Sequence, residues 1–102
     1  MFGMGAVPTS KLAQWRTLDA VRVLNSLADH AKRDPTFVPT KDSSTSRWHL
    51  SVCGQDFELL VTGPKFWDCR AKIGGAGAVD LTMHLRGIRF RAATALLEQV
   101  GY

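Results

Sequence analysis

Cysteine is scarce in this sequence: among 102 residues, only Cys53 and Cys69 are cysteines. Two cysteines without a C-x-x-C pair are too few for the disulfide framework of a small secreted protein. A chain of this length can also bury a modest core unaided, because single domains become marginal only below roughly 60 residues. We therefore expect two reduced, mostly buried thiols, with Cys69 in the core, and a fold that requires no metal ion.

Long apolar runs are absent as well. No stretch approaches the roughly 18 residues that can span a bilayer, and the start, MFGMGAVPTSK, lacks the basic segment and apolar core of a signal peptide. The composition, 45% hydrophobic and 22% charged, is that of an ordinary globular protein. We expect a cytoplasmic protein that does not bind a membrane.

Motifs for nucleotides, metals and catalysis are also lacking. The stretch GGAGAVD fits neither G-x-G-x-x-G nor G-x-x-x-x-G-K-[ST]. His49 and Cys53 lie four residues apart on one predicted strand, roughly 13 Å, so they cannot ligate the same ion. No cysteine stands in a motif that would supply a base and an orienting group. The sequence predicts a protein that is not an enzyme and holds no metal or cofactor.

What the sequence does have is an uneven distribution of charge. The net charge is +4, and residues 65–91 carry all of it, because that segment holds six basic and two acidic side chains. The rest of the chain has seven basic and seven acidic residues and is neutral. Such a concentrated excess is expected of a surface that meets a polyanion, although a solvated basic face that aids solubility gives the same pattern.

Hydrophobic residues recur at helical spacing near the start of the chain. Leucines and valines from Leu18 to Leu27 predict a helix that begins at Thr9 or at Thr17 and runs to about Lys32, and Thr17 is a suitable N-cap for the later start. Residues 1–16 are then a tail or an extra turn. They precede a single domain over residues 17–102.

From residue 47 the hydrophobic period changes from 3.6 to 2. The alternation predicts three strands, over residues 47–52, 57–61 and 66–71. The short turns GQD and GPK join them into an antiparallel meander. Two amphipathic helices follow, over residues 77–87 and 90–102. The expected fold is therefore α+β: an N-terminal helix, a three-stranded antiparallel meander and two short C-terminal helices.

The third predicted strand, FWDCRA, decides which aromatic side chain reaches the surface. Its more apolar face carries Trp67 and Cys69, and its other face carries Phe66 and Arg70. We therefore expect Trp67, like Trp48, to pack in the core, and Phe66 and Arg70 to be exposed. An exposed aromatic ring among basic residues on a sheet can stack unpaired bases.

The glycine-rich turn offers a second kind of contact. Around Gly75 and at the start of the helix at Ala78, backbone N–H groups are expected to face outward. Amides at a helix N-terminus attract anions. We expect this turn to provide a contact for a single phosphate group.

The stretch FWDCRAKIGGAGAVDLTMHLRGIRFRAATALL, residues 66–97, runs from an aromatic strand with one cysteine through a glycine turn, a short helix and a glycine to an F-x-x-A-x-x-L helix. This order, and the order of elements from residue 17 to about residue 100, resemble the zinc-binding N-terminal domain of bacterial-type DNA primases, especially primase-like proteins of plasmids and other mobile elements. In that family the aromatic strand leads into C-x-x-C, and the elements after it follow in the same order without gaps.

The zinc positions of the family are mostly replaced. They fall here on Val38, Lys41, Cys69 and Lys72, so only Cys69 is retained, and lysine cations repel Zn²⁺. The resemblance therefore implies a zinc-ribbon-like primase domain without metal. In the family this domain engages template DNA while a separate domain carries out catalysis.

Together, charge and resemblance predict a non-catalytic module that binds nucleic acid, single-stranded DNA above all, in the replication of a plasmid or other mobile element. Phe66 is the expected stacking platform. The full set of expected contacts is Lys41, Arg47, Phe66, Arg70, Lys72, Gly75, Arg86, Arg89 and Arg91. A different class stays open: a small mobile-element protein that binds, and inhibits or recruits, a protein of replication, conjugation or host defence.

Overall fold

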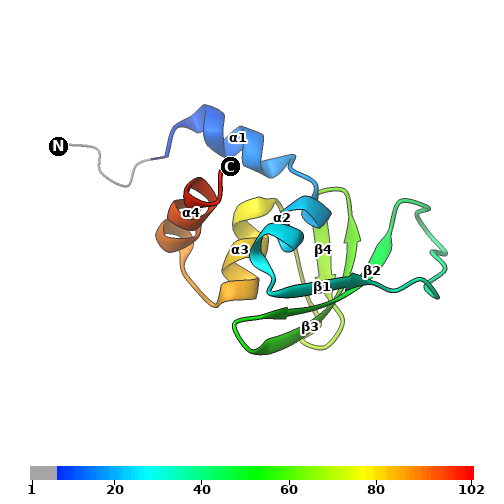
Figure 1. The fold of residues 1–102 in the computed structure, drawn as a ribbon. Helices are drawn as coiled ribbons and strands as arrows, with labels where there is room; N and C mark the ends of the chain where they lie inside the picture. Colours follow the sequence, from blue (N-terminus) through cyan, green and yellow to red (C-terminus); the bar gives the residue numbers. More distant parts are fainter. Residues whose placement is uncertain (1–6) are drawn as a thin grey trace.

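The computed structural model describes residues 7–102, so the part of the expected tail in residues 1–6 lies outside the described residues. The chain forms four helices and five strands there (Figure 1). In order they are α1 (Thr9–Arg16), α2 (Ala20–Leu27), β1 (His30–Arg33), β2 (Ser46–Val52), β3 (Gln55–Thr62), β4 (Lys65–Asp68), β5 (Ile73–Ala76), α3 (Ala78–Arg86) and α4 (Phe90–Gln99).

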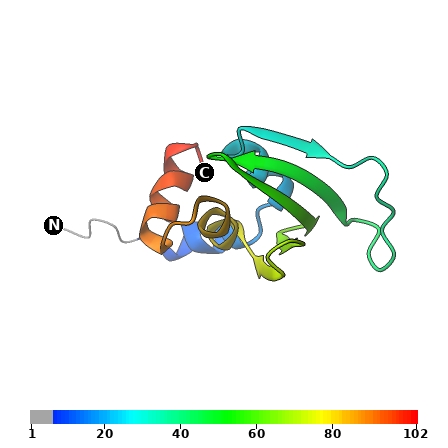
Figure 2. The same cartoon turned by 90° about the horizontal axis from the view of Figure 1, so that it is seen from below.

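The strands form one antiparallel sheet whose spatial order, β1-β2-β3-β4-β5, is also the order along the chain. The α+β class is thus confirmed, whereas the three-stranded meander and the helix count match only in part, because the sheet has five strands, the chain has four helices among the described residues, and the third predicted strand ends at Asp68. α2 and α3 pack against one face of the sheet, while α1 and α4 pack against α3 on the side away from it (Figures 1 and 2). Within residues 7–102, no helix is long and apolar enough to cross a membrane.

The hydrophobic core lies between the sheet and the helices. Helix α2 contributes Val23, Leu24 and Leu27, which recur on one side of the helix and are buried. The sheet contributes the alternate residues of β2 and β3, and α3 contributes Leu81 and Leu85. Because all these side chains lie on one face of the sheet, the opposite face stays uncovered by helices.

The start of the chain is more ordered than the sequence predicted. Residues 9–16 are a full helix rather than an extra turn, and Trp15 is only 1% exposed within the core. Asp19, not Thr17, caps α2, since its carboxylate accepts a hydrogen bond from the backbone N–H of Val21. Thr17 instead donates its hydroxyl to Gln14 at the end of α1. The helix α1 therefore belongs to the same packed unit as the rest.

The helix expected over residues 17–32 ends at Leu27, and residues 30–33 are strand β1. Ala28 and Ala31 continue the helical spacing in the sequence, but Ala28 has extended backbone geometry. The backbone N–H of Asp29 donates to Ser51, and Ala31 pairs with Leu50 on β2. Pairing with a distant strand thus overrides a local pattern that was compatible with helix.

The glycine-rich turn of the prediction is in fact strand β5, and the aromatic residues of β4 require its glycines. Phe66 pairs with Gly75, and a Cβ on Gly75 would lie 2.7 Å from Cζ of the Phe66 ring. Trp67 pairs with Gly74 on the other face, where a Cβ would lie 3.0 Å from the Trp67 ring. The two glycines therefore make room for one aromatic ring on each face of the sheet.

The predicted faces of β4 were inverted. Phe66 is buried at 5% exposure, whereas Trp67 is 45% exposed. The reason is the two-residue loop Gly63–Pro64, which pairs Thr62 with Lys65 and therefore Val61 with Phe66. Directly paired residues share a face, and Val61 faces the core. Phe66 consequently cannot serve as a stacking platform.

Replacing Gly75 by alanine is expected to destabilise the protein by about 1–3 kcal/mol, because the new methyl group overlaps the buried Phe66 ring. Gly74→Ala is the matched control, since the Trp67 ring that it meets is half-exposed and can move aside. Urea denaturation of both variants measures the difference. Equal losses of unfolding free energy in the two variants would contradict this account of the glycine pair.

Candidate nucleic-acid interface

The uncovered face of the sheet carries one exposed aromatic ring in a row of paired residues. Arg47 of β2, Leu60 of β3, Trp67 of β4 and Gly74 of β5 lie opposite one another across the four strands. Since Gly74 has no side chain, the Trp67 ring can lie flat against the sheet there. The row therefore presents an indole surface to solvent on a rigid β scaffold.

The segment between β1 and β2, residues 34–45, is fixed in place by short polar contacts. The Asp34 carboxylate accepts hydrogen bonds from the backbone N–H and the hydroxyl of Thr36. These bonds lower the pKa of Asp34. The Asp42 carboxylate likewise accepts hydrogen bonds from the backbone N–H and the hydroxyl of Ser44, and these bonds lower the pKa of Asp42. Both are Asx-type turns, so this long connection has a defined shape.

This connection and the uncovered sheet face enclose a groove with a volume of about 530 Å³. We call it the Trp67 groove; it is lined by Phe37, Pro39, Lys41 and Asp42 of the connection and by Leu60, Lys65 and Trp67 of the sheet, among others. Its walls are thus aromatic and aliphatic, with two lysines against one aspartate. A hydroxyl contact at 2.7 Å between Thr45 and Thr62 joins the connection to the sheet at the edge of the groove.

Arg47, an expected contact for nucleic acid, is engaged with acidic side chains. Its guanidinium pairs with Glu58, and its Nε lies 4.0 Å from the Asp34 carboxylate. His49 lies beside the same two acids, with its Nε2 3.6 Å from Asp34 and its Nδ1 3.9 Å from Glu58. The positive charge of Arg47 is therefore largely neutralised within the protein, and Arg47 is a poor candidate for a phosphate contact.

Arg70 and Lys72 are exposed in the turn between β4 and β5, and a buried carboxylate holds that turn. Asp68 is 3% exposed and accepts hydrogen bonds from the backbone N–H groups of Arg70 and Ala71, each at 2.9 Å. Its other oxygen lies 2.6 Å from Nε2 of His84 on α3. Burial alone would raise the pKa of Asp68, but the bonds from Ala71, His84 and Arg70 together lower it.

The two cysteines occupy different environments from those expected. Cys53 is exposed in the turn between β2 and β3, where its φ of 51° is left-handed. Cys69 is half-buried, and burial together with the nearby Glu58 carboxylate raises the pKa of its thiol. At neutral pH the Cys69 sulfur is therefore protonated and is not an activated nucleophile. Within residues 7–102, no three His, Cys, Asp or Glu side chains converge as metal ligands.

The structure does not favour the phosphate contact expected at the glycine turn. Gly77 and Ala78 at the start of α3 are buried, and a Cβ on Gly77 would lie 3.4 Å from Cα of Arg16 on α1. The first turn of α3 also carries the Asp80 carboxylate, which accepts a hydrogen bond from the backbone N–H of Ala76 on β5. Gly75 faces the Phe66 ring rather than solvent.

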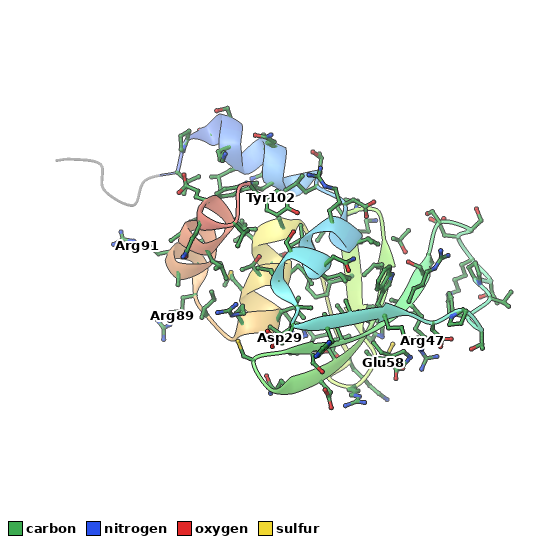
Figure 3. The ribbon with its side chains drawn as sticks, in the orientation of Figure 1. Asp29, Arg47, Glu58, Arg89, Arg91 and Tyr102 are labelled. Atoms are coloured by element: carbon green, nitrogen blue, oxygen red, sulfur yellow. The ribbon has the colours of Figure 1, made fainter. Side chains whose placement is uncertain are left out.

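The remaining expected residues do not form a single surface. Lys41 lies in the Trp67 groove, and Arg70 and Lys72 lie on the β4–β5 turn. Arg86, Arg89 and Arg91 belong to the α3–α4 region. Figure 3 shows Arg89 and Arg91 at the end of the molecule opposite to Arg47 and Glu58. The basic excess in residues 65–91 is therefore divided between two separate regions.

Sequence reasoning missed the aromatic residue that the surface presents. Trp67 was assigned to the core because it alternates with Cys69 and Ala71, and Lys65 and Phe37 were not singled out. One signal could have corrected this, namely the spacing between β3 and β4. A two-residue loop fixes which residues pair, so an inward Val61 requires an inward Phe66 and an outward Trp67.

The comparisons with known proteins find no similar protein. No family model matches the chain, and no curated protein or solved structure shows significant similarity to it.

Proposed function

We propose that this protein is a non-catalytic module that binds single-stranded DNA in the Trp67 groove. The observation that carries the proposal is the half-exposed Trp67 ring, held on the uncovered face of the sheet in a groove that Lys41 and Lys65 also line. Proteins that bind single strands without sequence preference combine these two features: aromatic rings that stack on bases, and basic residues that follow the backbone.

The groove suits an unpaired base and its flanking phosphates. Its volume of about 530 Å³ lies within the range of small-molecule sites, and its aromatic and aliphatic walls can exclude water from a stacked base. The ammonium groups of Lys41 and Lys65 lie among the lining residues, where they can pair with phosphates. Asp42 opposes them: the hydrogen bonds from Ser44 and the nearby Lys65 lower its pKa, so its carboxylate stays ionised and offsets part of this positive charge.

The motif resemblance supports the same class of ligand. It relates residues 17–100 to the template-binding domain of primases of plasmids and other mobile elements, and it implies no catalytic residues in this part of the chain. A role in the replication of such an element follows as part of this proposal. The Trp67 groove supports the binding of single strands on which this role depends, since a sheet surface with an exposed aromatic ring is able to hold an unpaired template base.

The direct test is a titration of a labelled thymine oligonucleotide at several salt concentrations. Affinity should fall steeply with salt, with a slope of about −0.7 per phosphate contact in a plot of log K against log salt. Lys41→Gln/Lys65→Gln should make this slope shallower by about 1.4, because two contacts are lost. The control Lys11→Gln/Arg16→Gln removes the same charge from α1 and should leave the slope nearly unchanged.

The absence of detectable binding at low salt would contradict the proposal and would favour the protein-partner hypothesis. Equal changes of slope in the groove variant and the α1 variant would show that binding follows overall charge rather than this groove. Circular dichroism of each variant establishes that the fold is retained.

A further inference from the structure

Helices α3 and α4 form a pair of helices joined by a short turn. Only residues 87–89 separate Arg86, the last residue of α3, from Phe90, the first of α4. Gly87 has left-handed geometry, with φ of 63°, and its N–H donates to Met83, which ends α3 sharply. In Figure 2, α3 is seen nearly along its axis while α4 runs across the view, so the two helices cross. Two crossing helices joined by a glycine-containing turn are the layout of helix-turn-helix DNA-binding units.

The two faces of α4 differ in the way that such a unit requires. One face packs against the protein through Ala93, Thr94 and Leu97, all of them buried. The opposite face is exposed, and its central residues are the alanines Ala92 and Ala95. Small side chains there would let the helix backbone approach a DNA groove closely, while the buried face keeps the helix rigid on its scaffold.

A cluster of arginines surrounds the start of α4. Arg86, Arg89 and Arg91 are exposed and form no ion pair with any acidic side chain among residues 7–102. Both labelled arginines, Arg89 and Arg91, project away from the body of the protein in Figure 3. Between them lies Phe90, which is 47% exposed. Unlike Arg47, these guanidinium groups are free to meet phosphates.

We propose that the α4 surface, defined as Arg86, Arg89, Phe90, Arg91, Ala92 and Ala95, binds double-stranded DNA. The start of α4 enters the major groove, as the second helix of a helix-turn-helix unit does, and the arginines bind phosphates beside it. Charge selects this ligand, because three unpaired arginines at residues 86–91 face solvent without a neighbouring acid in that stretch. This site lies apart from the Trp67 groove and does not depend on the function proposed there.

The test measures binding of the full chain to a labelled DNA duplex and, separately, to the thymine oligonucleotide. Arg89→Gln/Arg91→Gln should weaken duplex binding at least tenfold and reduce its salt slope by about 1.8, since each phosphate contact contributes about 0.9. The same variant should bind the single strand within twofold of the unchanged protein. Lys32→Gln/Arg33→Gln, two exposed residues of β1 outside both proposed sites, is the charge-matched control and should leave the duplex affinity nearly unchanged.

A second variant separates insertion of α4 from simple charge attraction. Ala95→Tyr adds bulk to the exposed face without changing the charge, so it should weaken duplex binding about tenfold while circular dichroism shows an intact fold. The proposal is overturned if the unchanged protein does not bind duplex at low salt, if Arg89→Gln/Arg91→Gln loses no more affinity than the β1 control, or if Ala95→Tyr binds normally. Loss of single-strand binding alone would overturn only the function proposed for the Trp67 groove.

Discussion

Trp67→Ala is expected to lower the affinity for a thymine oligonucleotide about 5- to 150-fold, because stacking of one base on an aromatic ring contributes about 1–3 kcal/mol. The ring is the exposed aromatic side chain of the Trp67 groove, and its position on β4 is fixed by pairing with Leu60 and Gly74. Removing it leaves the core intact, so the loss should be in binding and not in stability. Fluorescence anisotropy of labelled oligonucleotide measures the change.

Two companion variants sharpen this experiment. Trp67→Phe keeps a flat ring and should retain most of the affinity. Trp48→Phe, in a half-buried position on the core face of β2, should bind as the unchanged protein does. Tryptophan fluorescence gives an independent readout, since Trp15 is buried and quenching by a bound oligonucleotide should disappear in Trp67→Phe. Normal affinity in Trp67→Ala would exclude the Trp67 groove as the binding site.

Asp68→Ala is expected to lower the free energy of unfolding by about 3 kcal/mol. The substitution deprives the backbone N–H groups of Arg70 and Ala71 of their acceptor and leaves His84 facing an empty, buried position. Leaving several buried donors without their acceptor typically costs this much. Urea denaturation at neutral pH measures the loss. Asp56→Ala is the control, because that aspartate is exposed and should matter by less than about 0.5 kcal/mol.

The difference in unfolding free energy between the unchanged protein and Asp68→Ala should depend on pH. The folded-state pKa of Asp68 lies below its ordinary value of 3.8, so ionised Asp68 stabilises the fold at pH values above that value. This contribution is lost as the pH falls through the lowered folded-state pKa. The stability difference between the unchanged protein and Asp68→Ala should therefore be constant above about pH 5 and shrink below pH 4. A difference that is equally large at the lowest pH would contradict the role given to the ionised carboxylate.

The helices and central strands could be predicted from the sequence wherever the hydrophobic pattern is local. The alternation in residues 47–62 indicates strands, and the spacing of apolar residues after Ala78 indicates helices. The structure has strands β2 and β3 and helices α3 and α4 in these segments. Strands β1 and β5 could not be found in this way. Each is four residues long and has no apolar alternation of its own, and each forms because a neighbouring strand, β2 for β1 and β4 for β5, supplies hydrogen-bond partners.

The excess of basic residues at the candidate site could be predicted from the sequence, but the positions of those residues on the surface could not. The excess of positive charge in residues 65–91 is a property of the sequence, yet its division between the sheet side and the α3–α4 region depends on the fold. Arg47 illustrates why: its acidic partners, Asp34 and Glu58, are distant in sequence and meet it only when three strands assemble. Charge counts along a chain cannot separate neutralised arginines from free ones.

The sheet's sequential strand order also bears on how the protein folds and opens. Loops of two to four residues close every pairing from β2 to β5, and such local contacts form quickly because little chain entropy is lost in closing them. Only β1 must close the longer connection of residues 34–45, and its side chains are mostly exposed. β1 is therefore the strand that we expect to dock last and to exchange its amide hydrogens first. Since that connection is also a wall of the Trp67 groove, one wall of the binding surface continues directly from the least protected strand of the sheet.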